Sequence, residues 1–149
     1  MLYNAKAKIS TKYEDFVFYS YKDDKNFEHV TLVKGDVFEK ENVFCRLHSA
    51  CVAGDIFHSS ECTCNSELES AMEICEKEKT GLIIWMNHNS ISDYINSFDK
   101  MTEKKILRDF SFASKILNDL KVKSICLMTK NTEKVKQLKD LGINIVGMY

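Results

Sequence analysis

Short apolar runs alternate with amphipathic segments throughout the second half of the chain. The run Leu82–Met86 has the length and composition typical of a strand buried on both faces, Ser124–Thr129 is expected to be another buried strand, and Ile143–Val146 a last strand. Apolar residues at spacings of three and four mark three expected helices: Leu68, Ala71, Met72 and Cys75; Ile106, Phe110, Ala113 and Leu117; and Val135, Leu138 and Leu141. Strands that alternate with helices imply βαβ units and a mainly parallel sheet.

Polar residues and glycines suggest where these elements begin and end. Asn65 or Ser66 is expected to cap the first helix, with Gly81 closing the turn after it. Asn131 can cap the third helix, which Gly142 should end. The segment 87–102 is polar and shows no clear period, so we expect a loop there.

The first half of the chain is dominated by strand patterns. Residues 14–21 are rich in aromatic side chains, and residues 27–33 alternate weakly between apolar and polar. The cluster Asp23–Asn26 predicts a turn, as does Gly35-Asp36, and residues 42–48 form a further expected strand. We therefore expect an antiparallel meander, followed by the βαβ units, in an α/β (α+β) fold.

Composition limits the kind of protein that this chain can be. At 149 residues it has the length of one domain, 1–149, with 44% hydrophobic and 29% charged residues. A net charge of -1 gives no reason to expect binding to nucleic acid or to anionic lipid. No apolar run approaches the roughly 18 residues that span a bilayer, and no export signal opens the chain. We expect a cytoplasmic protein whose cysteines are reduced.

Three of the six cysteines form a cluster with metal-ligand spacing. Cys51, Cys62 and Cys64 lie on one short stretch that leads directly into an amphipathic helix, whose N-terminal dipole favours negatively charged sulfur. Three thiolates can hold a zinc ion and leave its fourth position free; the alternative is three unrelated small residues. The other cysteines lie in apolar patterns and are expected to pack in the core: Cys45, Cys75 and Cys126.

The residues around this cluster resemble a known signature. Arg46-Leu-His-Ser49, Cys51 with Gly54-Asp55, and Cys62-Thr-Cys64 before a helix are similar to the corresponding stretch of the GTP cyclohydrolase II family. That family hydrolyses the imidazole ring of GTP at the start of riboflavin synthesis, releasing formate and pyrophosphate. The similarity continues, with a gap in the middle, through 108–110, 127–131, Lys134 and 142–146.

The resemblance implies a role for several residues. Cys51, Cys62 and Cys64 match the zinc ligands, and Arg108 matches the arginine proposed to attack the α-phosphate. Positions that match substrate-binding residues or lie near the site are Arg46, His48, Glu67, Thr129 and Lys134. The resemblance also implies a purine nucleotide substrate, magnesium as a companion of its phosphates, and a homodimer.

The chain departs from the family in several places. His88–Ile91 replaces the family's Gln-Glu-Gly-Arg block, and about twenty residues around its catalytic tyrosine are missing by comparison with ordinary loop lengths. Tyr94 is the only nearby tyrosine, and an ungapped match does not place it at that position. Ile106 replaces an acid, as does Ala50, and Glu67 replaces a glutamine.

Two functions of different classes follow. The first is a zinc hydrolase that opens a purine ring, with His48, Asp55 or Glu67 as the proton acceptor. The second is a non-catalytic zinc module derived from the family. His58 could close the site as a fourth ligand or face solvent, and we favour the solvent-facing position. Arg108 could equally be a surface arginine paired with Asp109 or Glu103, and Thr129 and Lys134 could be a strand-end residue and an exposed helix lysine.

Overall fold

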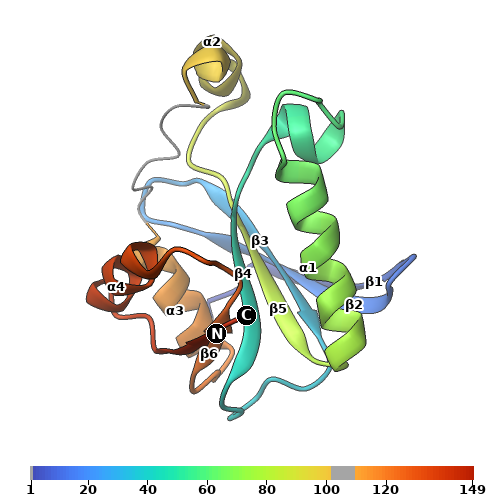
Figure 1. The fold of residues 1–149 in the computed structure, drawn as a ribbon, viewed down its shortest axis with the longest axis vertical. Coiled ribbons are helices and arrows are strands. Elements are labelled where there is room, and N and C mark those ends of the chain that lie inside the picture. Colours follow the sequence, from blue (N-terminus) through green and yellow to red (C-terminus); the bar gives the residue numbers. More distant parts are fainter. Residues whose placement is uncertain (1, 102–109) are drawn as a thin grey trace.

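The computed structural model describes residues 2–101 and 110–149, and its strands form one seven-stranded sheet (Figure 1). The strands follow the order β1-β2-β3-β5-β4-β6-β7 across this sheet. Their bounds are β1 Ala5–Thr11, β2 Glu14–Lys22, β3 Glu28–Lys34, β4 Val43–Ser49, β5 Gly81–Met86, β6 Ile125–Leu127 and β7 Ile145–Met148. The helices are α1 Cys64–Glu78, α2 Ile91–Met101, α3 Ser111–Asp119 and α4 Thr132–Asp140, with a π-helical turn, η1, at Val52–Ile56.

The sheet has an antiparallel half and a parallel half, which confirms the predicted α/β class. β1, β2, β3 and β5 pair antiparallel, whereas β5, β4, β6 and β7 pair parallel. The prediction that residues 42–48 continue the antiparallel meander is wrong. β4 lies between β5 and β6 because the α1 crossover returns the chain parallel to it, as βαβ connections do.

Helices cover both faces of the sheet (Figure 1). Ala71 and Cys75 of α1 pack with Phe44 and Ile83 on one face. The helices α3 and α4 cover the other face, in a core made by alternate strand residues and by Ala113, Ile116, Leu117 and Leu138. Cys45 and Cys75 are fully buried and Cys126 is half-buried, so the expected packing role is confirmed for the first two.

The predicted ends of α1 need correction. The helix begins at Cys64 with Thr63 before it, so Asn65 and Ser66 lie inside the first turn rather than at the cap. It ends at Glu78, and Lys79, not Gly81, takes the left-handed conformation that stops it. The earlier start brings Cys64 to the first position of the helix, where backbone N–H groups face outward.

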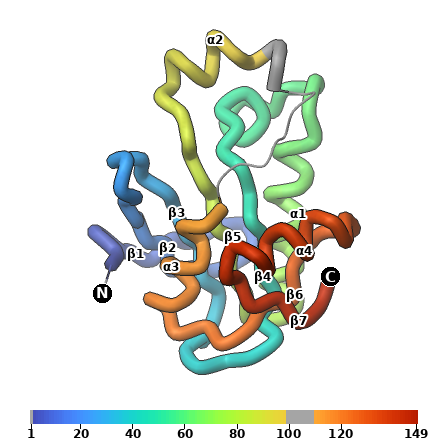
Figure 2. Tube along the Cα trace, turned by 90° about the vertical axis from the view of Figure 1, so that its left-hand side faces the viewer, coloured from blue at the N-terminus to red at the C-terminus, as the bar shows by residue number. Residues whose placement is uncertain are grey.

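The prediction of a loop over 87–102 is also wrong, because α2 occupies most of that segment. Ser90 caps this helix: its hydroxyl accepts a hydrogen bond from the Asp93 N–H at 3.1 Å. Ile91, Tyr94, Ile95 and Phe98 have helical spacing that the surrounding polar residues obscure. Figure 2 shows α2 at one end of the molecule, away from the sheet.

Several local predictions are confirmed. The Asp23 carboxylate accepts the N–H groups of Lys25 and Phe27 at 2.9 and 3.0 Å and so builds the predicted turn. Asn131 caps α4, and Gly142, at φ +90°, follows its end. Strand β1 was not predicted, because its alternating lysines and small residues give little strand signal. Ile106, expected in the second helix, lies outside the described residues.

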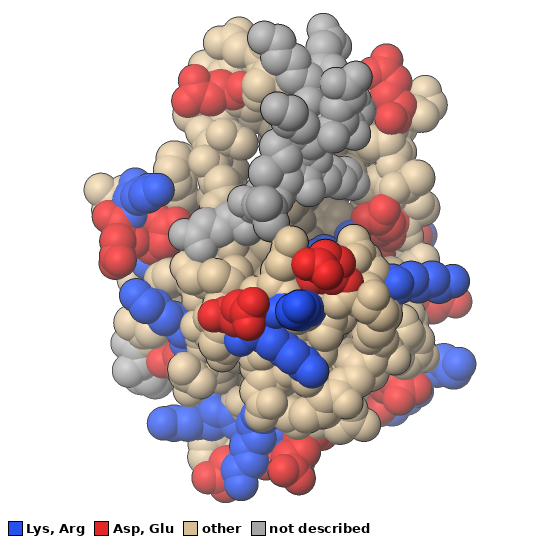
Figure 3. Space-filling model, turned by 60° about the vertical axis from the view of Figure 1, so that its left-hand side comes forward, with Lys and Arg blue, Asp and Glu red and all other residues tan. Residues whose placement is uncertain are grey.

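The surface of the described residues carries mixed charge. On the face shown in Figure 3, lysine and arginine side chains are interspersed with aspartate and glutamate. None of the helices in the described ranges has both the length and the apolar character needed to cross a membrane.

Candidate functional site

The three predicted cysteines meet beyond the carboxyl end of β4. The Sγ atoms of Cys51, Cys62 and Cys64 lie within 4.8 Å of one another, and those of Cys51 and Cys62 are 3.9 Å apart. A Cβ atom on Gly54 would lie 2.7 Å from the Cys62 Sγ and 2.8 Å from the Cys64 Cβ. A glycine is therefore required for the loop to fold around the sulfurs. Three converging thiols, with room kept between them by Gly54, fit a thiophilic metal such as zinc.

His58 is not part of this cluster. Its side chain is exposed, and in the described part of the chain the group that could hold a metal ion consists of the three cysteines alone. The residue has φ 56°, in the left-handed region. The solvent-facing interpretation of His58 agrees with this position.

A buried histidine–carboxylate pair, His48 and Asp55, lies between the cysteine loop and the sheet. The Asp55 carboxylate accepts hydrogen bonds from the His48 Nε2, the Cys51 N–H and the Trp85 Nε1, at 2.8, 2.9 and 2.8 Å. The side chains of His48 and Asp55 are 1% and 5% exposed. Burial alone would raise the pKa of Asp55, but these donors outweigh it and hold that pKa below its usual value. Asp55 thus joins the loop to β4 and β5.

The ionised Asp55 fixes how His48 carries its proton. A carboxylate can only accept, so Nε2 donates to it, and whenever the ring carries a single proton its Nδ1 is an acceptor. Among the described residues, this buried Nδ1 has no hydrogen-bond partner. Among the described residues, the His48 Nδ1 is thus a buried acceptor without a donor, whereas the carboxylates of Asp55 and Glu67 each accept hydrogen bonds on both oxygens.

Arg46 lies on the same face of β4 as His48, two residues earlier. Its Nη2 pairs with the Glu67 carboxylate of α1 at 2.5 Å, and its Nη1 donates to the Met128 carbonyl at 3.4 Å. The second contact reaches the residue just before Thr129. Arg46 thus bridges the start of α1, beside Cys64, and the end of β6.

Tyr94 is a member of the site that the sequence did not identify. Its hydroxyl lies 3.0 Å from the Cys51 Sγ and accepts the Ala53 N–H at 3.0 Å. Burial opposes ionisation of Cys51, but hydrogen bonds from Tyr94 and from the Gly54 backbone lower the pKa of this thiol below its usual value. The helical spacing of Ile91, Tyr94 and Phe98 was the signal that could have placed this side chain.

The remaining predicted residues lie around the turn between β6 and α4. The Thr129 hydroxyl accepts the Asn131 N–H at 3.2 Å, and the Asn131 side chain accepts the Lys134 N–H at 3.1 Å. The Lys134 Nζ lies 5.7 Å from the centre of the Phe110 ring. Thr129 therefore lies two residues before the Asn131 cap of α4, and Lys134 lies in the first turn of that helix. Arg108 lies outside the described residues.

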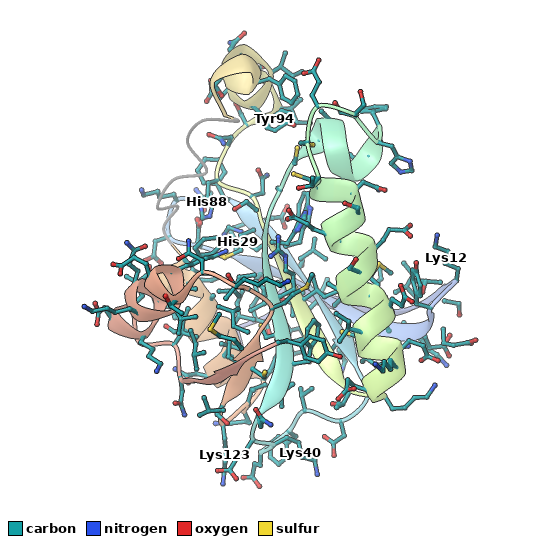
Figure 4. The ribbon with its side chains drawn as sticks, in the orientation of Figure 1. Lys12, His29, Lys40, His88, Tyr94 and Lys123 are labelled. Atoms are coloured by element: carbon teal, nitrogen blue, oxygen red, sulfur yellow. The ribbon has the colours of Figure 1, made fainter. Side chains whose placement is uncertain are left out.

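His88, the first residue that replaces the family's Gln-Glu-Gly-Arg block, faces the α3 side of the sheet. Its ring is 5.6 Å from that of His29 and 6.2 Å from that of Phe110. Figure 4 shows His29 and His88 close together, well below Tyr94 and the cysteine loop.

Together these features define an α/β protein with a cluster of three cysteines, suited to hold a metal ion, at the carboxyl edge of parallel strands. A model of the family described as GTP cyclohydrolase II matches residues 3–149. The chain is 34% identical to the GTP cyclohydrolase-2 of Buchnera aphidicola over 159 positions, which cover 95% of this chain and 82% of the relative. The GTP cyclohydrolase-2 of Neisseria meningitidis serogroup A is 32% identical over 161 positions, covering 97% and 82%. The chain belongs to the GTP cyclohydrolase II family.

Longer proteins contain a similar region. The riboflavin biosynthesis protein RibBA of Chlorobium phaeovibrioides is 33% identical over 94% of this chain, which spans 38% of that protein. A solved structure of RibBX, a two-domain 3,4-dihydroxy-2-butanone 4-phosphate synthase from A. baumannii, has a TM-score of 0.59 at 18% identity. It covers 87% of this chain, which spans 34% of RibBX, and it supports the fold alone.

Proposed function

We propose that this protein is a zinc-dependent cyclohydrolase that opens the imidazole ring of GTP or a related purine nucleotide and releases formate. Membership of the GTP cyclohydrolase II family supports a cyclohydrolase activity in riboflavin biosynthesis. The observation that carries the proposal is the group of three sulfurs within 4.8 Å, on a loop held by the buried His48–Asp55 pair.

Cys51, Cys62 and Cys64 would hold the zinc ion. A zinc ion held by three protein ligands would supply a Lewis acid for water activation, as in catalytic rather than structural zinc sites. We call this part of the site, with Asp55 and Tyr94, the metal end.

His48 is the proposed proton acceptor at the metal end. Its Nδ1 can take a proton from the water that attacks the carbon of the substrate's imidazole ring. Meanwhile Asp55 holds the His48 side chain in place and stabilises the imidazolium that forms on it. Releasing that carbon as formate breaks two C–N bonds and consumes two water molecules, so the acceptor must return its proton to a departing nitrogen. The buried His48–Asp55 pair suits this proton exchange, because the His48 Nδ1 can accept a proton and later return it.

Thr129, Asn131 and Lys134 form what we call the phosphate end. Backbone N–H groups at the start of α4 and the Lys134 ammonium favour bound phosphate, with magnesium as its companion in solution. Arg46 lies between the two ends through its contacts with Glu67 and Met128. We propose that it contacts the nucleotide between the ring and the phosphates.

The proposal is tested by incubating zinc-loaded protein with a panel of purine nucleotides and quantifying formate, pyrophosphate and ring-opened product by mass. Formate from at least one nucleotide is expected. Arg108→Ala should abolish any pyrophosphate release while formate remains measurable. Formate from none of the nucleotides would favour the non-catalytic zinc module instead.

We also propose a homodimer, on the resemblance to the family alone. Sedimentation at tens of micromolar, a range set by ordinary interface strengths, should show the dimer. A clean monomer there would contradict it.

A further inference from the structure

The buried hydroxyl of Tyr94 on α2 contacts the cysteine loop. Tyr94 is 5% exposed and packs with Cys51 and Cys64, and Phe98, one helical turn later, lies beside it with the ring centres 5.9 Å apart. Figure 4 shows the Tyr94 side chain between α2 and the loop that carries the sulfurs. The hydroxyl is the polar group through which α2 reaches the cluster.

The direction of the hydrogen bonds at this hydroxyl follows from its two partners. A backbone N–H can only donate, so the Tyr94 oxygen accepts from Ala53, 3.0 Å away. The hydroxyl proton is then available to the Cys51 Sγ, also at 3.0 Å. A thiolate can only accept. When Cys51 is a metal ligand, Tyr94 must therefore donate to it.

We propose that Tyr94 is a positioning residue of the metal end, which donates its hydroxyl proton to the Cys51 thiolate and thereby links the docking of α2 to the binding of the metal. This inference rests on the zinc site of the proposed function. Groups that orient a ligand from outside the coordination sphere commonly change metal affinity by 10- to 100-fold. Tyr94 orients Cys51 toward the other two sulfurs while Ala53 holds the tyrosine oxygen in place.

Metal binding should also stabilise the docked position of α2. A hydrogen bond to a charged acceptor is stronger than one to a neutral thiol, so the contact strengthens when zinc fixes Cys51 as the thiolate. The two equilibria are linked: if the docking of α2 raises the affinity of the site for the metal, then bound metal must stabilise the docked position of α2 by the same free energy. The amide protons of α2 should therefore exchange more slowly in the zinc-loaded protein than in the zinc-free protein.

The test is the variant Tyr94→Phe in the full chain, since phenylalanine keeps the ring and its packing. We expect zinc affinity, measured by competition with a chelator, to fall about tenfold or more. In the cobalt-substituted protein, the sulfur-to-metal charge-transfer band should move to lower energy, because a thiolate without its donor releases an electron more easily. Tyr13→Phe is the matched control: its hydroxyl bonds to Glu69 instead, so both readouts should equal those of the unmutated protein.

A second variant separates the hydrogen bond from packing. Phe98→Leu trims the neighbouring ring and leaves the Tyr94 hydroxyl in place, so its cobalt band should stay where it is. An unchanged affinity and band in Tyr94→Phe would overturn the inference, as would an equal band shift in Phe98→Leu or equal α2 exchange with and without zinc. Failure of the unmutated protein to bind zinc would instead overturn the metal site of the proposed function, and this inference with it.

Discussion

The metal end and the phosphate end of the candidate site differ in how firmly their side chains are held. At the metal end, Cys51 and Asp55 lie in a buried network with His48, Trp85 and Tyr94. At the phosphate end, Asn131 is exposed and Thr129 and Lys134 are half-buried. In the proposed function, the ring chemistry, which needs fixed geometry, would take place in the buried network, and the highly charged phosphates would bind at the end that is open to solvent. Substitutions at the two ends should therefore change different kinetic constants.

Loss of one thiolate should have the largest effect. Cys62→Ser replaces a soft, readily ionised ligand with a hydroxyl, so bound zinc and ring opening should both fall to background. Metal analysis of the purified protein and formate release measure the two losses.

Two control variants sharpen this result. Cys126→Ser changes a half-buried thiol outside the cluster and should retain about one zinc per chain. His58→Ala should retain it as well. Zinc that survives Cys62→Ser undiminished would show that the ion is held elsewhere.

The second largest effect is expected when a side chain fills the space beside the sulfurs. Gly54→Ala places a methyl group 2.7 Å from the Cys62 Sγ, so the loop must shift. We expect zinc affinity to fall more than tenfold and stability to decrease by about 1–3 kcal/mol, the usual range for overpacking. Chelator competition and chemical denaturation measure these effects.

Gly147→Ala is the matched control for this change. Its new methyl group would meet its nearest neighbour, the Cys126 Sγ, at 3.6 Å, which is ordinary contact. Zinc affinity should be unaffected. Equal behaviour of the two alanine variants would contradict the requirement for glycine at position 54.

The phosphate end should respond through binding rather than through turnover. Lys134→Ala removes a charge that attracts phosphate both before and during the reaction, so KM should rise about tenfold with kcat little changed. Steady-state kinetics provide the test, with the exposed Lys136→Ala on the same helix as the control. A fall in kcat at constant KM would show that Lys134 acts in the chemical step, and it would contradict the proposed difference between the two ends.

The smallest effects are expected at the helix cap. Asn131→Ala should cost about 1 kcal/mol of stability, because the Lys134 N–H loses its acceptor. Asn131→Asp keeps that acceptor but adds a negative charge near the bound phosphate. It should restore stability in chemical denaturation yet raise KM, and this combination separates capping from phosphate binding. Equal KM values in the two variants would argue against phosphate at this turn.

The sequence predicted the parts of this molecule that depend on local patterns. The buried strands, the Asn131 cap and the cysteine cluster are each set by neighbouring residues, through burial, capping or ligand spacing. The position of β4 was missed because strand order depends on long-range pairing, which no local pattern encodes.

The details of the site were missed for a related reason. Tyr94 reaches Cys51 from 43 positions further along the chain. Asp55 is polar and close to the cysteines, but its role depends on Trp85 and His48, which lie on two adjacent strands. Such contacts are fixed by the tertiary fold, so the candidate residues could be named from the sequence while the network among them could not.

X-ray absorption at the zinc edge of the zinc-loaded, unmutated protein counts the atoms around the ion, and so it separates a catalytic site from a structural one. We expect three sulfur neighbours and one light neighbour without the scattering pattern of imidazole, and an unchanged spectrum in His58→Ala. Three sulfurs with one histidine nitrogen that is lost in His58→Ala, or four sulfurs, would make the site structural and contradict the proposed hydrolase.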